Sequence, residues 1–261
     1  MRDNAIQKIG LNMFSLRELC GDRAALERTL DRVANAGYRY VQVSGIRGVD
    51  PEGIAAAMDA AGLSACATHV GWDRFVGDID EVIDLHRLYG TTHAAIGGLP
   101  DEYRSADGVG RFVREARDVL PRLAEAGIDF SYHNHNHEFV RIAGTTWLDL
   151  LYKESADLGV NFEIDTYWVV AGGADPADYI DRFASRMSIV HVKDMTVTTA
   201  REQRFAPVGS GNLNWPRVFD AIRCAPIEFV IVEQDAHYGG DEIANVTDSF
   251  RFLVDHGFAV E

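Results

Sequence analysis

The chain has 261 residues, of which 47% are hydrophobic, so it can bury a substantial core as one large domain or two small ones. Its formal net charge of −15 argues against a nucleic-acid partner, because the phosphates would be repelled. No apolar run reaches transmembrane length, and Met1 to Gly10 contain no long apolar segment. The widely spaced Cys20, Cys66 and Cys224 indicate free thiols in a reducing compartment, so we expect a cytoplasmic protein without membrane attachment.

Short apolar runs alternate along the chain with longer segments of helical periodicity. The predicted strands are, in chain order, residues 9–14, 40–44, 63–69, 93–96, a fifth run that carries residues 132–139, and then 160–165, 188–192 and 229–233. The predicted helices lie at about 26–34, 51–61, 79–89, 108–126, 147–154, 177–184, 215–224 and 243–256. Gly37, Gly62 and Gly90 suit the exits of the first three helices.

These elements form repeated strand–helix units of roughly 30 residues, the length that parallel crossovers require. No low-complexity linker divides them, so the sequence predicts a single (β/α)8 TIM barrel over residues 1–261. An open doubly wound sheet is the alternative. It would normally carry a glycine-rich phosphate-binding turn after the first strand, and the segment Asn12-Met13-Phe14-Ser15 is no such turn.

Polar residues end most of the predicted strands, where a barrel of this kind has its active site. They are Asn12, Gln42, Ser44, His69, the cluster from His133 to Glu138, Asp165, His191 and Glu233. The preceding residues are mostly apolar, as in strands that are covered on both faces. A buried polar side chain needs a partner, and one metal ion would satisfy several of them together.

The expected metal ligands are Glu138, Asp165, His191 and Glu233. A carboxylate-rich set with one imidazole suits a divalent ion, with Mn²⁺ favoured and Mg²⁺, Co²⁺ or Zn²⁺ as alternatives, better than a closed structural zinc site. Lys193 shares the face of His191 if that strand continues, and it could then stabilise an oxyanion. By the same alternation Glu163 shares the face of Asp165, as a supporting carboxylate or as a partner of Lys193.

Five further residues are candidates for contact with the substrate: Asn12, His69, His133, His135 and Trp168. A lone histidine is more often a satisfied core residue, but His133 has His135, His137 and Glu138 beside it. For His69 a structural role and a binding role are equally open. Trp168 either forms an apolar wall around a sugar or packs against loops.

The strand ends resemble those of the xylose isomerase-like barrels, also called the sugar phosphate isomerase/epimerase family. The most specific segments are His191-Val192-Lys193-Asp194, the strand that ends at Asp165, Val232-Glu233 and the loop of residues 207–215. The resemblance implies one divalent metal, often Mn²⁺, that holds two adjacent oxygens of a ketose or keto-cyclitol. It also implies two glutamates that move protons on opposite sides of the substrate, here Glu138 and Glu233.

Strand five departs from the family pattern. The usual glutamate ends that strand at the position of His133 here. Glu138 can replace it only if the chain past His135 turns back over the barrel mouth. This histidine-rich strand resembles the branch of the family that includes inosose dehydratase-like proteins.

The expected function is therefore a metal-dependent isomerase or epimerase that acts through an enediolate on a keto-sugar or keto-cyclitol. A dehydratase or lyase acting on a keto-sugar, keto-glycoside or inosose with the same metal is the alternative. A barrel endonuclease for abasic sites would need a basic surface, which the net charge of −15 opposes. From another class, the chain could be a non-catalytic sugar-binding subunit. A homo-oligomer is compatible with the sequence, which shows no interface.

Overall fold

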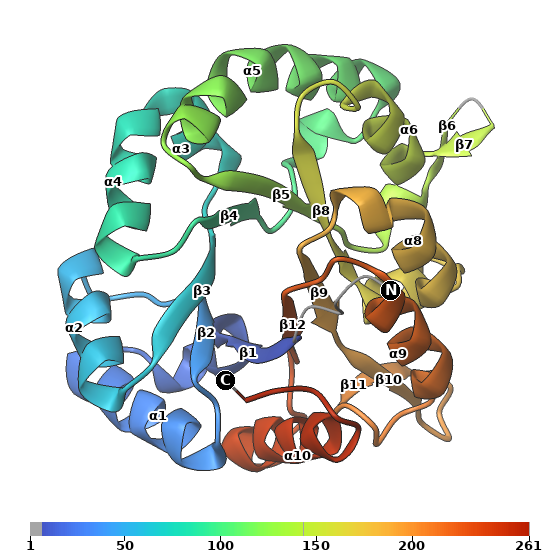
Figure 1. Ribbon diagram of the computed structural model, residues 1–261. Coiled ribbons are helices and arrows are strands. Elements are labelled where there is room, and N and C mark those ends of the chain that lie inside the picture. The colour runs from blue at the N-terminus through green and yellow to red at the C-terminus, as the bar shows by residue number, and fades with distance from the viewer. Residues whose placement is uncertain (1–6, 143, 261) are drawn as a thin grey trace.

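The computed structural model describes residues 7–142 and 144–260. In this part of the chain, parallel strands close into a barrel in the order β1-β12-β9-β8-β5-β4-β3-β2. Figure 1 looks along the barrel, with the helices as an outer ring. The barrel strands are β1 (Lys8–Asn12), β2 (Tyr40–Val43), β3 (Ser64–His69), β4 (His93–Ile96), β5 (Asp129–His133), β8 (Val160–Asp165), β9 (Ile189–Val192) and β12 (Phe229–Val232). The predicted (β/α)8 barrel is confirmed.

The ring closes between its first and last strands. Lys8 of β1 is aligned with Phe229 of β12, and Gly10 of the same strand is aligned with Tyr40 of β2. Lys8 also forms a parallel bridge with Ala259, near the other end of the described chain. The single-domain prediction covers residues 1–261, of which 1–6, 143 and 261 lie outside the described residues. The prediction that Met1 to Gly10 contain no long apolar segment also falls mostly on residues outside the described part.

The helices that surround the barrel are α1 (Arg23–Ala36), α2 (Pro51–Ala61), α3 (Trp72–Gly77), α4 (Ile79–Tyr89), α5 (Ala106–Glu125), α6 (Trp147–Glu154), α7 (Thr166–Ala171), α8 (Pro176–Phe183), α9 (Trp215–Cys224) and α10 (Glu242–Asp255). Their ends follow local chemistry. The Asp22 side chain caps α1 by accepting a hydrogen bond from the Ala25 amide, and Gly37 ends the helix at φ 117°. None of the described helices has the length and apolar character that crossing a membrane requires.

Several short elements were not predicted. They are the helices α3 and α7, the 3-10 helices η1 (Met13–Leu19), η2 (Asp101–Tyr103), η3 (His137–Phe139) and η4 (Ala184–Arg186), and the small sheets β6–β7 (Arg141–Ile142, Thr145–Thr146) and β10–β11 (Asp194–Val197, Gln203–Ala206). The first strand was expected to reach Phe14, but it ends at Asn12 because that side chain accepts a hydrogen bond from the Phe14 amide and starts η1.

The interior of the barrel changes from apolar to polar along its axis. A small apolar cluster of Cys66, Ala67, Ile189, Phe229 and Ile231 packs inside, apart from the larger core that lies between strands and helices. His191 and Glu233 follow Ile189 and Ile231 by two residues, and alternate residues of a strand point to the same face. The polar layer therefore sits at the carboxyl ends of the strands. Cys20, Cys66 and Cys224 are free, as expected.

Candidate active site

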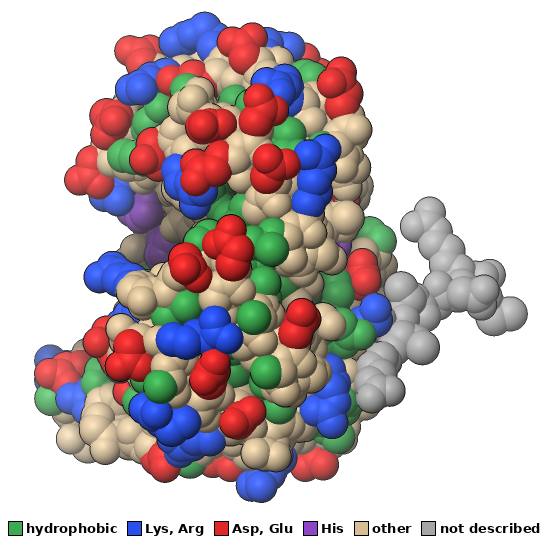
Figure 2. Space-filling model, turned by 90° about the vertical axis from the view of Figure 1, so that its left-hand side faces the viewer, with side chains coloured by type: hydrophobic (Ala, Val, Ile, Leu, Met, Phe, Trp, Pro, Cys, Tyr) green, Lys and Arg blue, Asp and Glu red, His purple; other side chains and the backbone are tan. Residues whose placement is uncertain are grey.

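A cavity of about 200 Å³ opens at the carboxyl ends of the strands. Its lining consists of Phe14, Ser44, Gly45, His69, Gly97, His133, His135, Glu233 and Asp235. Figure 2 shows histidine side chains at the base of a hollow on the left-hand edge of the molecule. We call this cavity the mouth cavity. The polar residues at the predicted strand ends indicated an active site at this end of the barrel.

Four buried side chains meet at the mouth: His133, Asp165, His191 and Glu233. Each offers one ligand atom, and these atoms lie within 4.8 Å of one another. Parallel register aligns Asp165 with His191, whereas His133 is aligned with Glu163 and His191 with Ile231, two residues before Glu233. The buried Nδ1 of His133 has no hydrogen-bond partner among the described residues, while Oδ2 of Asp165 and Nε2 of His191 have the Lys193 ammonium and the Glu163 carboxylate as their respective ion-pair partners, each at 3.3 Å. This group, which we call the barrel cluster, could hold a metal ion.

Lys193 supplies the positive charge of the site. Its Nζ lies 3.3 Å from Asp165 Oδ2, 3.2 Å from Glu233 Oε2 and 2.8 Å from Asp235 Oδ1, and its side chain is only 1% exposed. Although burial opposes the charged form, these three carboxylates raise the pKa of Lys193 well above its usual range. The ammonium group also faces the Trp168 ring at 5.3 Å.

The two carboxylates of the barrel cluster have different protonation behaviour. Burial raises the pKa of Asp165 to about 7, against the opposing effect of the Lys193 charge. Burial acts in the same direction on Glu233, but Lys193 and His191 outweigh it and hold the pKa of this carboxyl well below its usual range. For His191, burial is outweighed by the Glu163 carboxylate, at 3.3 Å, and by the hydrogen-bonded Glu233 carboxylate, at 2.9 Å, which raise its pKa to about 10. Without a metal, His191 is therefore an imidazolium.

Glu163, which was expected to be a supporting carboxylate or a partner of Lys193, lies two residues before Asp165 on β8. Its Oε2 lies 2.9 Å from His69 Nε2 and 3.3 Å from His191 Nε2, while Gln42 donates to both of its oxygens at 3.2 Å. Burial is opposed by the contacts with the His191 and His69 imidazoles, which lower the pKa of Glu163 to about 2. The alternative pairing of Glu163 with Lys193 is not observed. Instead, this carboxylate orients two imidazoles of the mouth.

The structure does not bring Glu138 to the other three expected metal ligands. The strand ends at His133, and the next residues turn away because the Asn134 side chain accepts a hydrogen bond from the Asp165 amide at 3.0 Å. Glu138 is then tied beside β5, where its carboxylate accepts from the Tyr132 hydroxyl at 2.7 Å and the His135 amide at 2.8 Å. His133, expected to bind substrate, takes its place in the barrel cluster.

The other expected substrate contacts divide between the mouth and its surroundings. His69 and His135 line the mouth cavity, whereas Asn12 is buried and caps η1. Trp168 lies beside the mouth, with its ring 5.1 Å from that of His135. Burial lowers the pKa of His135 to about 4, so this imidazole is neutral near pH 7.

Two glycines directly after β4 leave space for the His69 and His135 rings. A Cβ on Gly97 would lie 3.3 Å from His69 Nδ1, and one on Gly98 would lie 3.4 Å from His135 Nδ1. Gly98 also has φ 115°, which side-chain-bearing residues rarely adopt. The Gly97-Gly98 pair therefore serves the site as well as a turn.

Asp194 organises the loop that follows the His191 strand. Its carboxylate accepts hydrogen bonds from the amides of Met195, Gly209, Gly211 and Leu213 and from the indole of Trp215. The Asp194 side chain is fully buried, so the last residue of the segment His191-Val192-Lys193-Asp194 has a structural role.

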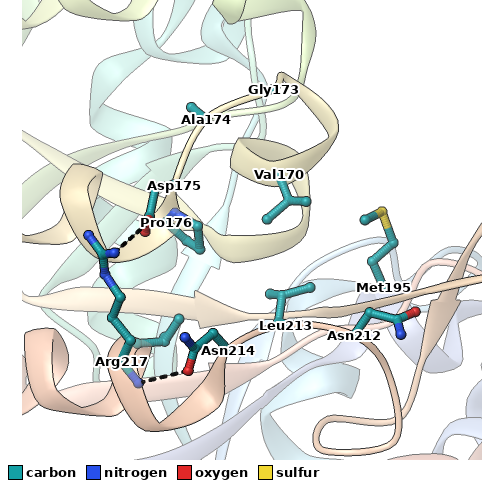
Figure 3. Close-up of a pocket in the computed structure, with 11 residues that line it drawn as sticks. Val170, Gly173, Ala174, Asp175, Pro176, Met195, Asn212, Leu213, Asn214 and Arg217 are labelled. Atoms are coloured by element: carbon teal, nitrogen blue, oxygen red, sulfur yellow. Dashed lines mark hydrogen bonds and ion pairs between the residues drawn. The ribbon is translucent and has the colours of Figure 1, made fainter.

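A larger cavity, of about 460 Å³, lies away from these residues. Figure 3 shows it between α8, the start of α9 and the loop at Asn212, with the Arg217 guanidinium 3.1 Å from the Asp175 carboxylate. It contains none of the residues expected to carry the chemistry. Size alone therefore does not identify the active site.

The fold and the barrel cluster together define a parallel (β/α)8 barrel with a candidate metal site at its mouth. Residues 30–256 match the family model described as xylose isomerase-like TIM barrel, and the chain belongs to this family. The expected family resemblance is thus confirmed.

Individual relatives are distant. An inosose dehydratase of Geobacillus thermodenitrificans (strain NG80-2) is 29% identical over 139 residues, which are 45% of this chain and 46% of that protein. The match thus spans about half of the relative's length. A crystal structure of a sugar phosphate isomerase/epimerase from Parabacteroides distasonis ATCC 8503 has a TM-score of 0.81 at 24% identity, over 97% of this chain and 99% of that one. A structure of L-ribulose 3-epimerase has a TM-score of 0.73 at 18% identity, over 95% and 94% of the two chains. At these identities the structures show a shared fold.

Proposed function

We propose that this protein is a divalent-metal-dependent sugar isomerase or epimerase that acts on a keto-sugar or keto-cyclitol through an enediolate. The observation that carries the proposal is the barrel cluster, His133, Asp165, His191 and Glu233, whose ligand atoms lie within 4.8 Å of one another beside the mouth cavity. The buried Nδ1 of His133 has no hydrogen-bond partner among the described residues, and a buried polar atom of this kind is costly unless a partner such as a cation satisfies it.

The donor set fits such an ion. Two imidazoles and two carboxylates suit Mn²⁺, Co²⁺ or Zn²⁺ better than Mg²⁺, which prefers oxygen donors, and we retain Mn²⁺ as the first candidate. When bound, a divalent ion supplies Lewis-acid polarisation of the substrate carbonyl and its neighbouring hydroxyl. The two histidines must be neutral to ligate, so His191 gives up the proton that its carboxylate partners hold on it.

Glu233 is our candidate for the base that removes the proton next to the carbonyl. It lines the mouth cavity and is ionised, although the Lys193 and His191 charges that lower its pKa also weaken it as a base. Glu138, the other glutamate expected to move protons, does not line that cavity, and its carboxylate is engaged by Tyr132 and His135. We assign the second proton-transfer role to His69, which lines the cavity and is oriented by Glu163 at 2.9 Å.

Lys193 has a supporting role in this proposal: it does not line the mouth cavity, and it offsets the charge of the carboxylates that surround the forming enediolate. Its ammonium group is already positioned by Asp165, Glu233 and Asp235 at the mouth, so little reorganisation is needed during the reaction.

The charges at the mouth favour an unphosphorylated substrate. Lys193 is neutralised by three carboxylates, and the Arg17 guanidinium donates to the carbonyl oxygens of Phe14 and Asp235. Among the described residues that line the mouth cavity there is no arginine or lysine. A phosphate group would therefore meet Glu233 and Asp235 without a free cationic side chain.

Elimination is the second candidate reaction, and one observation favours it. His135 and Gly97 line both the mouth cavity and a neighbouring cavity of about 450 Å³. A substrate larger than one sugar could extend from the first cavity into the second, with the bond to its leaving group near His135. A dehydratase or a keto-glycoside lyase would use the same cluster and expel a β-hydroxyl or β-alkoxide after the same proton abstraction.

The test is a screen of keto-sugars, keto-cyclitols and keto-glycosides, each with and without phosphate, using protein reloaded with Mn²⁺ after chelation. We expect turnover of an unphosphorylated substrate that chelator abolishes. Glu233→Gln should lower kcat/KM by about 10²–10⁴. The release of an unsaturated product would assign elimination. Sugar binding without turnover in the metal-loaded protein would contradict the proposal and favour a non-catalytic binding subunit.

A further inference from the structure

A second group of metal-ligating side chains lies in the loop that follows β5. It consists of His135, His137 and Glu138, whose ligand atoms lie within 4.8 Å of one another. His137 Nε2 is 2.9 Å from Glu138 Oε1, and the rings of His135 and His137 are stacked with centroids 5.6 Å apart. None of these residues belongs to the barrel cluster.

The loop is held in a fixed shape. The His135 amide donates to Glu138 Oε2 at 2.8 Å, and the turn continues with the Phe139 amide donating to the Asn136 carbonyl at 3.1 Å. The Tyr132 hydroxyl donates to Glu138 Oε1 at 2.7 Å and orients the carboxylate from behind. Metal-binding carboxylates are commonly oriented by such outer partners.

Two features of this group call for a cation. Glu138 is 1% exposed, and the ionisable groups that lower its pKa against the effect of burial are chiefly the His137 and His135 side chains. In addition, the buried Nδ1 of His135 has no hydrogen-bond partner among the described residues. A cation bound between the rings and the carboxylate would compensate the buried charge of Glu138.

The separations are compatible with chelation. Nitrogen and oxygen ligands lie about 2.0–2.2 Å from Zn²⁺, so neighbouring ligand atoms in a tetrahedral site are roughly 3–3.5 Å apart. His137 Nε2 and Glu138 Oε1 are already at nearly that separation, at 2.9 Å. Rotation of the His135 and His137 rings can bring the third donor closer, since the side chain of His137 is 27% exposed.

We propose that His135, His137 and Glu138 form a second divalent-cation site, for which Zn²⁺ is the best-suited ion. Two imidazoles, one carboxylate and one open position make a three-ligand zinc site of the kind that accepts an oxygen ligand. His135 and His137 both line the neighbouring cavity of about 450 Å³, together with Trp72, Leu99 and Arg104. The open position is therefore accessible to a hydroxyl or carboxylate of a molecule that enters this cavity.

The competing explanation is a plain ion pair between protonated His137 and Glu138, with His135 as a neighbour. The two explanations differ in metal stoichiometry. Purified protein is stripped with chelator, equilibrated with Zn²⁺ alone, and compared by elemental analysis and titration calorimetry. The variants are His137→Gln, His135→Gln and Asp165→Asn. The matched control is His256→Gln, which changes an exposed histidine directly after the last residue of α10.

We expect wild type and His256→Gln to hold two ions per chain, and His137→Gln, His135→Gln and Asp165→Asn to hold one each. The combination of His137→Gln with Asp165→Asn should hold none. If His137→Gln binds as many ions as wild type, the second site does not exist. If wild type binds one ion that Asp165→Asn loses, the second site is again refuted, while the barrel cluster is supported. If Asp165→Asn loses nothing and His137→Gln loses one ion, the second site stands and the proposed barrel metal fails.

Discussion

Replacing Lys193 by methionine should destabilise the metal-free protein and make its stability depend strongly on metal. The ammonium group is the shared partner of Asp165, Glu233 and Asp235, at 3.3, 3.2 and 2.8 Å. Methionine keeps most of the volume of the side chain but removes its charge. The three carboxylates, of which Asp165 is fully buried and Glu233 nearly so, then face one another without this cation.

The expected cost follows from the burial of the network. Removing one partner of a buried ion pair typically costs about 3–5 kcal/mol, because the remaining charge stays desolvated. Protonation of Asp165, whose pKa already lies at about 7, relieves part of the repulsion, so the lower end of this range is the safer expectation. For 261 residues the unfolding entropy is roughly 550 cal/mol/K, which converts about 3–5 kcal/mol into a drop in Tm of about 5–9 °C.

The assay is thermal unfolding followed by circular dichroism, in chelator and in Mn²⁺. We expect Lys193→Met to unfold at a lower temperature than wild type in chelator and the gap to narrow in Mn²⁺, because the divalent ion replaces the missing charge between Asp165 and Glu233. Lys153→Met is the matched control, since Lys153 is 80% exposed and its ion pair with Glu154, at 3.8 Å, lies at the surface. Equal unfolding temperatures of Lys193→Met and wild type in chelator would show that the network contributes no net stability and would refute the reasoning.

Three further outcomes can be measured. Glu138→Gln should keep the ion of the barrel cluster, and His133→Ala should weaken the binding of that ion at least tenfold, as measured by calorimetry. If instead His133→Ala keeps the ion and Glu138→Gln loses it, Glu138 is the ligand. Metal affinity should rise between about pH 6 and pH 8, and binding should release protons. The reason is that the pKa of Asp165 is raised to about 7 and that of His191 to about 10, and both groups must lose protons to bind the metal. Calorimetry in two buffers of different ionisation enthalpy measures the proton release, and an affinity that does not change with pH would contradict this prediction. Asp194→Ala should cost at least about 3 kcal/mol in urea unfolding, because it removes the acceptor of five buried or partly buried hydrogen bonds; a cost below about 1 kcal/mol would mean that water replaces the carboxylate.

The barrel was predictable because its information is local and periodic. Each strand is a short apolar run, each helix has its own face and cap, and Gly37 and Gly62 end the first two helices in the left-handed conformation that the sequence suggested. Asp165, His191 and Glu233 could be placed together for a similar reason. Each ends a predicted parallel strand, and those ends meet at one rim.

The position of Glu138 could not be obtained in this way. Alternation along a strand says which residues share a face only while the strand continues, and β5 stops at His133. The stop depends on a contact between distant residues, the Asn134 side chain and the Asp165 amide. Glu163 was underestimated for a related reason, since its importance comes from His69 and Gln42, which lie on strands far away in the sequence.

The closure of the barrel has a consequence for synthesis on the ribosome. The outer edge of β1 pairs with β12 at Lys8–Phe229, and Lys8 also bridges to Ala259, so this edge has no partner until nearly the whole described chain has been made. An open parallel sheet exposes unpaired amide and carbonyl groups and is prone to pair with other chains. We therefore expect the nascent chain to reach its native fold only after synthesis of β12. Until then the unpaired edge of β1 is a surface to which chaperones can bind.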